Sequence, residues 1–125
     1  MKFSKHSFRF IIIACLCVQS VFLFALDVPP LNGPVNDYAH IFTASETQEL
    51  NAYLYSIDRQ SYLQIAVLTI PSLEGESLED YSIRVAEKWQ IGQKGKDSGV
   101  ILVIAAQDRK LRIEVGYGLE DRITD

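Results

Sequence analysis

The stretch Lys94-Gly-Lys-Asp-Ser-Gly99 opens the part of the chain that decides the fold. An apolar run from Val100 to Ala106 follows it directly, and a second run spans Leu111 to Val115. The segment Gln107-Asp-Arg-Lys110 joins the two runs, which predicts an antiparallel hairpin. Gly116-Tyr-Gly-Leu-Glu-Asp121 then leaves the second strand. Because hairpin strands run in opposite directions, the loops that flank them are predicted to lie at the same edge of the sheet.

Acidic residues are concentrated in these two flanking loops. Asp97 precedes the first strand, and Glu120, Asp121 and Asp125 follow the second. Carboxylates crowded at one edge repel each other unless they are solvated, protonated or bridged by a cation. This convergence raises the question of a divalent-cation site, for which Asp97, Glu120 and Asp125 are the candidate ligands and Asp37, brought in by the N-terminal segment, is a fourth candidate. The alternative for Asp97 is a local role, in which its side chain bonds its own backbone in a tight turn.

The N-terminus has the pattern of an export signal. Lys2, Lys5 and Arg9 form a basic region, and the 17 residues from Phe10 to Leu26 carry no charge. We expect a signal peptide over residues 1–25, cut after Ala25. A retained single anchor is an alternative, although this run is at the short end of the roughly 17 to 25 residues that span a bilayer. Lipidation is a further alternative, since Ile12-Ile-Ala-Cys15 resembles a lipobox.

Removal of that segment changes the composition of the chain. The whole sequence has 12 basic and 16 acidic residues and a net charge of −4. Three basic residues and both cysteines, Cys15 and Cys17, lie in the signal, so the mature chain would carry a net charge of −7 and no disulfide. An acidic surface argues against nucleic acid as a partner. We expect an exported protein that is periplasmic, extracellular or membrane-associated.

The mature portion is long enough for one domain. Its first residues, 26–34, contain three prolines and are expected to form a linker. Helices are predicted from about Ala44 to Gln60 and from about Leu78 to Gln90, each after capping-type residues, and a strand is predicted over Tyr62–Ile70.

The alternation of strand, helix and strand predicts a right-handed crossover, with Tyr62–Ile70 parallel to Val100–Ala106. The apolar run Val100–Ile104 suggests a central strand covered on both faces. The expected fold class is therefore α/β, a layered α/β/α sheet with a parallel centre and an antiparallel hairpin strand. The acidic loops are predicted at the edge opposite the carboxyl ends of the parallel strands, where open α/β sheets usually bind ligands.

Four motifs resemble the TPM-domain family, which includes thylakoid-lumen acid-phosphatase-like proteins and bacterial exported or membrane-associated proteins. Val35-Asn-Asp-Tyr-Ala39 resembles the family's opening Val-x-Asp-x-Ala element, and Phe42-Thr-Ala-Ser-Glu46 resembles the start of its first helix. Trp89-Gln-Ile-Gly92 with the segment 94–100 is similar to its Trp-x-x-Gly and Lys-Gly-x-Asp-x-Gly elements. Gly116-Tyr-Gly-Leu-Glu120 with Thr124-Asp125 is similar to its Gly-x-Gly-Leu-Glu and Thr-Asp ending.

The resemblance covers residues 35–125, with two departures from the family pattern. Asp121 stands where the family usually has glycine, and Ser98 replaces a frequent asparagine. The family continues into further helices beyond this point, so we expect that the C-terminal part of the domain is missing here. Calcium-binding members of the family strengthen the cation prediction. Calcium is preferred to zinc because the candidate ligands are hard oxygen donors and His40 is the sole histidine after the signal.

For function, the sequence favours an accessory or interaction module at a membrane or cell envelope, with a divalent cation and an envelope or membrane protein as partners. The sequence contains no Gly-x-Ser-x-Gly, P-loop or paired-histidine motif, and identifies no nucleophile. The resemblance implies an alternative, a metal-assisted acid phosphatase that acts on phosphomonoesters. Such an enzyme would use a metal-bound water and a carboxylate base at the acidic edge.

Overall fold

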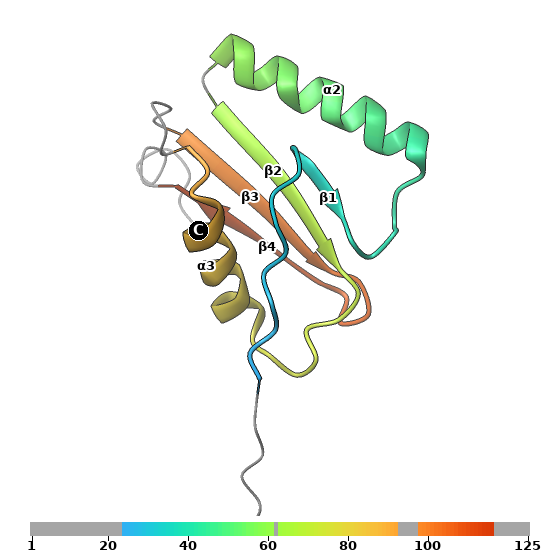
Figure 1. Cartoon of the computed structure of the whole chain (residues 1–125), viewed down its shortest axis with the longest axis vertical. Helices are drawn as coiled ribbons and strands as arrows, with labels where there is room; N and C mark the ends of the chain where they lie inside the picture. Colours follow the sequence, from blue (N-terminus) through green and yellow to red (C-terminus); the bar gives the residue numbers. More distant parts are fainter. Residues whose placement is uncertain (1–23, 62, 93–97, 117–125) are drawn as a thin grey trace, which may run out of the picture.

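A computed structural model describes residues 24–61, 63–92 and 98–116 (Figure 1). Within these ranges, the elements in chain order are β1 (Val35–Asp37), α2 (Ala44–Ser61), β2 (Leu63–Ile70), α3 (Leu78–Trp89), β3 (Ser98–Ala105) and β4 (Lys110–Val115). Both predicted helices and the three predicted strands are present, and their bounds differ from the predictions by one or two residues. The three-residue strand β1 lies in the segment from Val35 to Phe42, whose residues alternate in character but for which the sequence predicts no defined element.

The four strands form one sheet in the order β1-β2-β3-β4. β1 and β2 are parallel, β2 and β3 are parallel from Leu63↔Ser98 to Ile70↔Ala105, and β4 pairs antiparallel with β3. The predicted α/β fold class, with a parallel centre and an antiparallel hairpin strand, is therefore confirmed. The crossover from β2 to β3 is made by α3, as parallel neighbours require.

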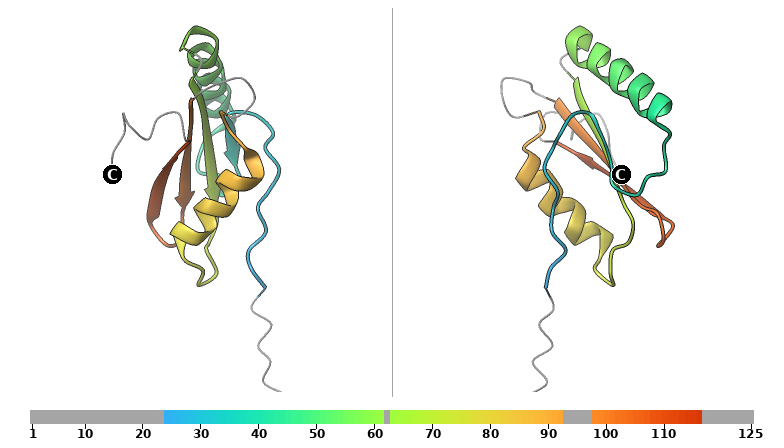
Figure 2. Two further views of the ribbon diagram at one scale, coloured as in Figure 1. Left: turned by 90° about the vertical axis from the view of Figure 1, so that its left-hand side faces the viewer. Right: turned by 45° about the vertical axis from the view of Figure 1, so that its right-hand side comes forward.

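The two helices pack on opposite faces of the sheet (Figures 1 and 2). On one face, Tyr81, Val85 and Trp89 of α3 join the larger core cluster with buried residues of β2 and β3 such as Val103. On the other face, Leu54 of α2 packs with residues of β1 and β2. The sheet is thus the middle layer, and each helix covers a different part of it.

The face of β3 that lies on the side of α2 is less covered than the apolar run predicted. Burial alternates along β3, and Val100, Leu102 and Ile104 are only half-buried. Their neighbours on β4 are more open: Leu111, which pairs with Ile104, is 65% exposed, and Ile113 is 52% exposed. The expectation of cover on both faces is therefore met only in part among the described residues, because the cluster around α2 is centred on β1 and β2 and reaches β3 at Leu102.

Local sequence explains where each helix begins. At α2, the Thr43 hydroxyl accepts a hydrogen bond from the Glu46 amide at 3.2 Å, and the Glu46 carboxylate accepts one from the Thr43 amide at 2.7 Å. This reciprocal pair is the capping box that the sequence predicted. At α3, the Ser77 hydroxyl accepts from the Asp80 amide, and Gln90 ends the helix in the left-handed conformation with φ 48°.

Trp89, the last residue of α3, contacts both the sheet and the N-terminal segment. Leu78, Tyr81, Val85 and Trp89 share one face of the helix, which predicts that Trp89 is buried against the sheet. Its side chain is 8% exposed and belongs to the larger core cluster, so this prediction is confirmed. The indole N–H donates to the Pro29 carbonyl at 2.8 Å, so the ring also satisfies a main-chain group outside the sheet.

We expect Trp89→Ala to lower the free energy of unfolding by about 3–5 kcal/mol, as for other large aromatic residues removed from a core. Trp89→Phe keeps most of the apolar contact but loses the indole N–H, so its cost should be closer to about 1 kcal/mol. Urea unfolding followed by circular dichroism measures both values. Equal costs for the two variants would contradict a core role for the ring.

Candidate functional site

The loops that flank the hairpin leave the sheet at the same edge. Val100 pairs with Val115, and beyond this pair the Gly116 amide donates to the Gly99 carbonyl at 2.7 Å. The segment that enters β3 and the segment that leaves β4 are therefore hydrogen-bonded at their last described residues. This confirms the predicted convergence as far as Ser98 and Gly116.

Three glycines make this convergence possible. A Cβ added to Gly92 would lie 2.6 Å from the Gly99 nitrogen, and one added to Gly99 would lie 2.4 Å from the Ile91 carbonyl oxygen. A Cβ on Gly116 would lie 3.2 Å from the Gly99 oxygen. The three main-chain segments are thus in direct contact, without room for side chains between them. We call Gly92, Gly99 and Gly116 the glycine contact.

The segment that ends α3 is tied to the start of β2. Gly92 has φ +81°, a conformation that glycine adopts without strain. Its amide donates to the Gln64 side-chain oxygen at 3.0 Å. The edge at which β3 begins is therefore fixed by hydrogen bonds from two neighbouring strands as well as by the close main-chain packing.

The structure describes Asp37 but not the other three predicted ligands. Asp97, Glu120 and Asp125 lie outside the described residues, and so does Asp121. Among residues 24–61, 63–92 and 98–116, no group of three or more histidine, cysteine, aspartate or glutamate side chains has the arrangement of a metal site. The described part of the edge is the main-chain scaffold from which the two acidic segments depart.

Asp37 lies at the opposite edge of the sheet. It pairs with Thr69, whereas Ser98, where β3 begins, pairs with Leu63. Six residues of β2 separate these two levels, which corresponds to about 20 Å along a parallel strand. The prediction that Asp37 is a fourth ligand is therefore corrected, because the parallel register separates it from the segment that enters β3.

The Asp37 carboxylate instead organises the turn between β1 and α2. One oxygen accepts from the Thr69 hydroxyl at 2.5 Å and from the Ile41 amide at 3.1 Å, and the other accepts from the Phe42 amide at 3.0 Å. Burial alone would raise the pKa of Asp37, but these three hydrogen bonds outweigh it and hold the pKa below its ordinary value of 3.8.

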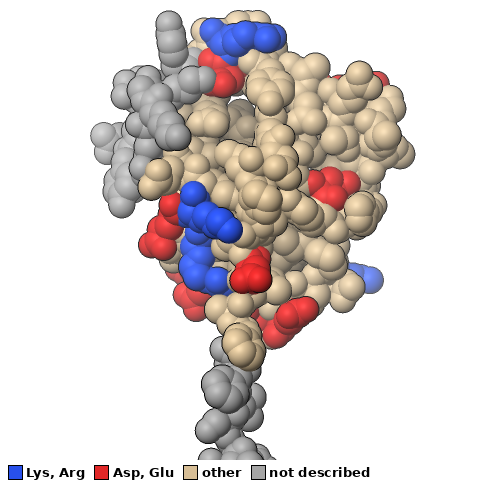
Figure 3. Space-filling view, in the orientation of Figure 1, with Lys and Arg blue, Asp and Glu red and all other residues tan. Residues whose placement is uncertain are grey.

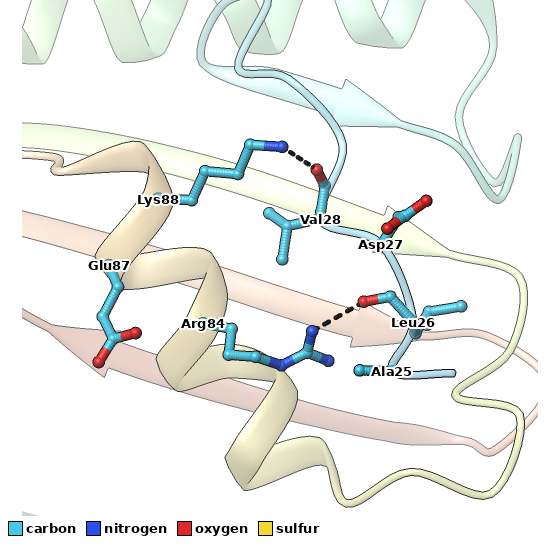
Figure 4. A pocket seen from close by; sticks show the side chains of 7 residues that line it. All are labelled: Ala25, Leu26, Asp27, Val28, Arg84, Glu87 and Lys88. Atoms are coloured by element: carbon cyan, nitrogen blue, oxygen red, sulfur yellow. Dashed lines mark hydrogen bonds between the residues drawn. The ribbon is translucent and has the colours of Figure 1, made fainter. Parts of the chain in front are cut away.

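Sequence reasoning missed a second cluster, along the side of α3 that adjoins its core-facing residues. There a shallow cleft of about 500 Å³ is lined by the segment 25–28 and by Arg84, Glu87 and Lys88 (Figure 4). The Arg84 guanidinium donates to the Leu26 carbonyl at 2.8 Å, and the Lys88 ammonium donates to the Val28 carbonyl. Residues 26–29, which the sequence predicts as part of a linker, are held against the domain by hydrogen bonds from side chains of α3 to their main-chain carbonyls.

The signal that could have found this cluster is the spacing of donors along α3. Tyr81, Arg84, Lys88 and Trp89 recur at three-, four- and one-residue intervals and therefore share one side of the helix. The apolar residues of this helix predict core packing, and nothing in the sequence pattern indicates that the segment after the signal returns to the helix.

Comparison with known proteins connects this fold to a family. The family model described as the TPM domain matches residues 35–125. The chain belongs to the TPM-domain family. No curated protein matches it.

Two solved structures resemble this TPM domain. The solution NMR structure of the N-terminal domain of a protein from P. gingivalis has a TM-score of 0.66 and 32% identity, over 73% of this chain and 58% of that one. The N-terminal domain of the cg2496 protein from Corynebacterium glutamicum has a TM-score of 0.59 and 18% identity, over 76% of this chain and 62% of that one, and supports the fold alone. The chain thus spans about three fifths of each solved chain.

The close packing at the glycine contact predicts that adding a single methyl group there lowers the free energy of unfolding by a large amount. We expect Gly99→Ala to lower the free energy of unfolding by about 3 kcal/mol, because its Cβ would overlap the Ile91 carbonyl and the backbone would have to move. Gly75→Ala is the control: Gly75 has φ +84° but open space around it, so the cost should be about 1 kcal/mol of conformational strain. Denaturant unfolding compares the two. A Gly99→Ala variant as stable as the Gly75→Ala variant would contradict the close packing.

The hydrogen bonds of Asp37 predict a pH-dependent contribution to stability. We expect Asp37→Ala to cost about 2 kcal/mol at neutral pH, because charge-assisted hydrogen bonds are lost. Since the pKa of Asp37 is lower in the folded state, its contribution is present above the unfolded pKa and is lost as pH falls through the folded value. Asp37→Asn keeps the shape but cannot titrate. The melting temperatures of the parent chain and of Asp37→Asn should therefore approach each other as the pH falls from neutral to below 3.8, whereas Asp37→Ala, which lacks the acceptor at every pH, should stay the least stable.

Proposed function

We propose that this TPM domain is exported, binds a divalent cation at the edge where β3 begins, and acts as an accessory or interaction module at a membrane or cell envelope. The observation that supports the site best is the 2.7 Å hydrogen bond between Gly116 and Gly99. It joins the two segments that lead to Asp97 on one side and to Glu120 and Asp125 on the other.

The donor chemistry favours calcium. Asp97, Glu120 and Asp125 supply carboxylate oxygens, and calcium accepts six to eight oxygen ligands in flexible geometry. The main-chain carbonyls near Gly99 add further oxygen donors to the proposed set. A bound calcium ion would neutralise the repulsion between these carboxylates and link the two acidic segments. Asp37 is not part of this proposal, because it lies at the other edge of the sheet.

The export and envelope parts of the proposal rest on the N-terminal sequence. A basic region and an uncharged run precede the domain, and the chain that follows Ala25 has a net charge of −7. No helix within residues 24–61, 63–92 and 98–116 combines the length and apolar character needed to span a membrane. A membrane connection would therefore involve other residues of the chain or a protein partner of the domain.

Basic side chains of the hairpin do not support the phosphatase alternative. Lys110 pairs with Ala105, at the end of β3 that lies away from the glycine contact, and Arg109 precedes it. Arg112 is paired with Glu114 and with Glu79. A phosphatase that used the proposed cation would need positive charge beside the substrate phosphate. Among these hairpin residues, Arg109 and Lys110 carry their positive charge at the opposite edge of the sheet, and Arg112 is already ion-paired. Phosphatase activity is therefore an outcome of the test below.

We expect calcium to raise the melting temperature of the exported chain, because a ligand that binds only the folded state stabilises it. At 100 times the dissociation constant the gain is about 2.7 kcal/mol. Asp97→Asn should abolish most of this gain, whereas Glu49→Gln, which removes an exposed carboxylate on α2, should leave it unchanged. Differential scanning calorimetry with calcium, magnesium or chelator measures the effect. A calcium response that survives Asp97→Asn would contradict the site.

The same samples separate the binding module from an enzyme. Each is incubated with p-nitrophenyl phosphate in the presence of calcium, and release of p-nitrophenol is followed. A binding module gives a thermal response without turnover. Turnover that depends on both calcium and Asp97 would replace the proposed function by the phosphatase, and the absence of both responses would reject the cation site.

A further inference from the structure

Leu26 is held at both of its main-chain polar groups. Its nitrogen donates to Oε2 of Glu76 at 3.2 Å, and its carbonyl accepts from Arg84 at 2.8 Å. Arg84 is in turn ion-paired with the other carboxylate oxygen of Glu76. One residue of the N-terminal segment is therefore enclosed by an acid from the loop before α3 and a base from α3 itself.

The three residues that follow are held in the same way. The carbonyl of Asp27 accepts from the Tyr81 hydroxyl, that of Val28 from the Lys88 ammonium, and that of Pro29 from the Trp89 indole. Four consecutive carbonyls thus each accept a hydrogen bond from a different side chain of α3. Because these contacts are to the main chain, they fix the position of the segment rather than read its side chains.

The pair of Glu76 and Arg84 is only partly exposed to solvent, at 20% and 32% of their side chains. Partial burial reduces screening, so a charge placed next to this pair interacts with it more strongly than on an open surface. Figure 3 shows acidic and basic atoms side by side over α3, on the face along which the N-terminal segment runs. Leu26 also packs its side chain against the larger core cluster.

We propose that Glu76 and Arg84 form a docking site for a new N-terminus, created when the bond between Ala25 and Leu26 is cut. A signal peptidase hydrolyses this amide with one water molecule: Ala25 leaves with a carboxylate, and the Leu26 nitrogen becomes an ammonium group. That nitrogen is the atom that already donates to Glu76. Cleavage therefore converts a hydrogen bond between an amide and a carboxylate into an ion pair.

The charges around the Leu26 nitrogen determine whether the pKa of the new α-amino group is raised or lowered. The carboxylate of Glu76 is its direct partner, and the positive charge of Arg84, which binds both the other Glu76 oxygen and the Leu26 carbonyl, opposes it. The other ionisable groups of the two neighbouring clefts are Asp27 on the segment itself, Tyr38 after β1, Glu74 in the loop, and Tyr81, Glu87 and Lys88 on α3. Because the carboxylate is the group hydrogen-bonded to the nitrogen itself, whereas Arg84 binds the carbonyl, the ammonium form is favoured and the pKa of the α-amino group is raised.

Docking gives the mature chain a defined starting point. The ion pair at Leu26 and the three following carbonyl contacts would hold the first four residues on α3, and so keep the new end from fraying as chain termini commonly do. A precursor whose residue 26 is still an amide has the hydrogen bonds but lacks the charge. Signal removal would therefore complete the attachment of the segment to the helix.

The test measures the α-amino group itself. This proposal rests on the export proposed above, so mass spectrometry of the exported protein first establishes whether the chain begins at Leu26. The α-amino pKa is then obtained from its rate of labelling with an amine reagent across pH, relative to an unstructured peptide that begins Leu-Asp-Val. We expect an increase of about one unit over the usual 7.7–8.0, a tenfold change in proton affinity.

Three variants decide the role of Glu76. Glu76→Gln should return the α-amino pKa to that of the peptide, while Glu87→Gln, which lines the same cleft from α3, should leave it raised. A chain that begins at Ala25 displaces the ammonium by one residue and leaves the Glu76–Arg84 pair intact, so it should also give the peptide value. An unshifted pKa in the chain that begins at Leu26, or a shift that persists in Glu76→Gln, overturns the docking site. A different natural start overturns cleavage at Leu26 and leaves the cation proposal unaffected.

Discussion

The parallel pairing of β2 with β3 is the constraint on which the rest of the structure depends. It runs over eight residues of each strand, from Leu63↔Ser98 to Ile70↔Ala105. Parallel neighbours cannot be joined by a short turn, so the chain must return across the sheet, and α3 makes that return. The glycine contact follows from the same pairing, because the end of α3 and the start of β3 must meet at one edge, where β4 also ends.

The helix α3 contacts both the core of the domain and the N-terminal segment. Its inner side supplies Tyr81, Val85 and Trp89 to the core, and side chains along the adjoining side bind the main chain of residues 26–29. Tyr81 and Trp89 contribute to both, since each has an apolar ring in the core and a polar atom bonded to a carbonyl. Burial raises the pKa of the Tyr81 phenol to about 12, so it remains a hydrogen-bond donor throughout the physiological range.

Much of the fold could be predicted from local patterns. The capping residues Thr43 and Ser77, the apolar run of β3 and the hairpin turn each act over a few residues, and each element formed where its pattern indicated. The candidate site was predictable in part. The convergence of the hairpin's flanking segments followed from strand direction alone, but the position of Asp37 depended on the register of β1 against β2, for which three residues contain no readable signal.

By itself, the sequence determined the fold class, the order of the helices and strands, the burial of Trp89 and the TPM-domain resemblance, because these follow from periodicity, capping and motif order within short windows. Only the tertiary structure decided which face of β3 stays open, that Asp37 lies at the far edge, and that residues 26–29 return to α3. The contacts of Leu26 with Glu76 and Arg84 join residues 50 and 58 positions apart. Such contacts leave no periodic trace in the sequence, because they depend on how separate elements are placed in space.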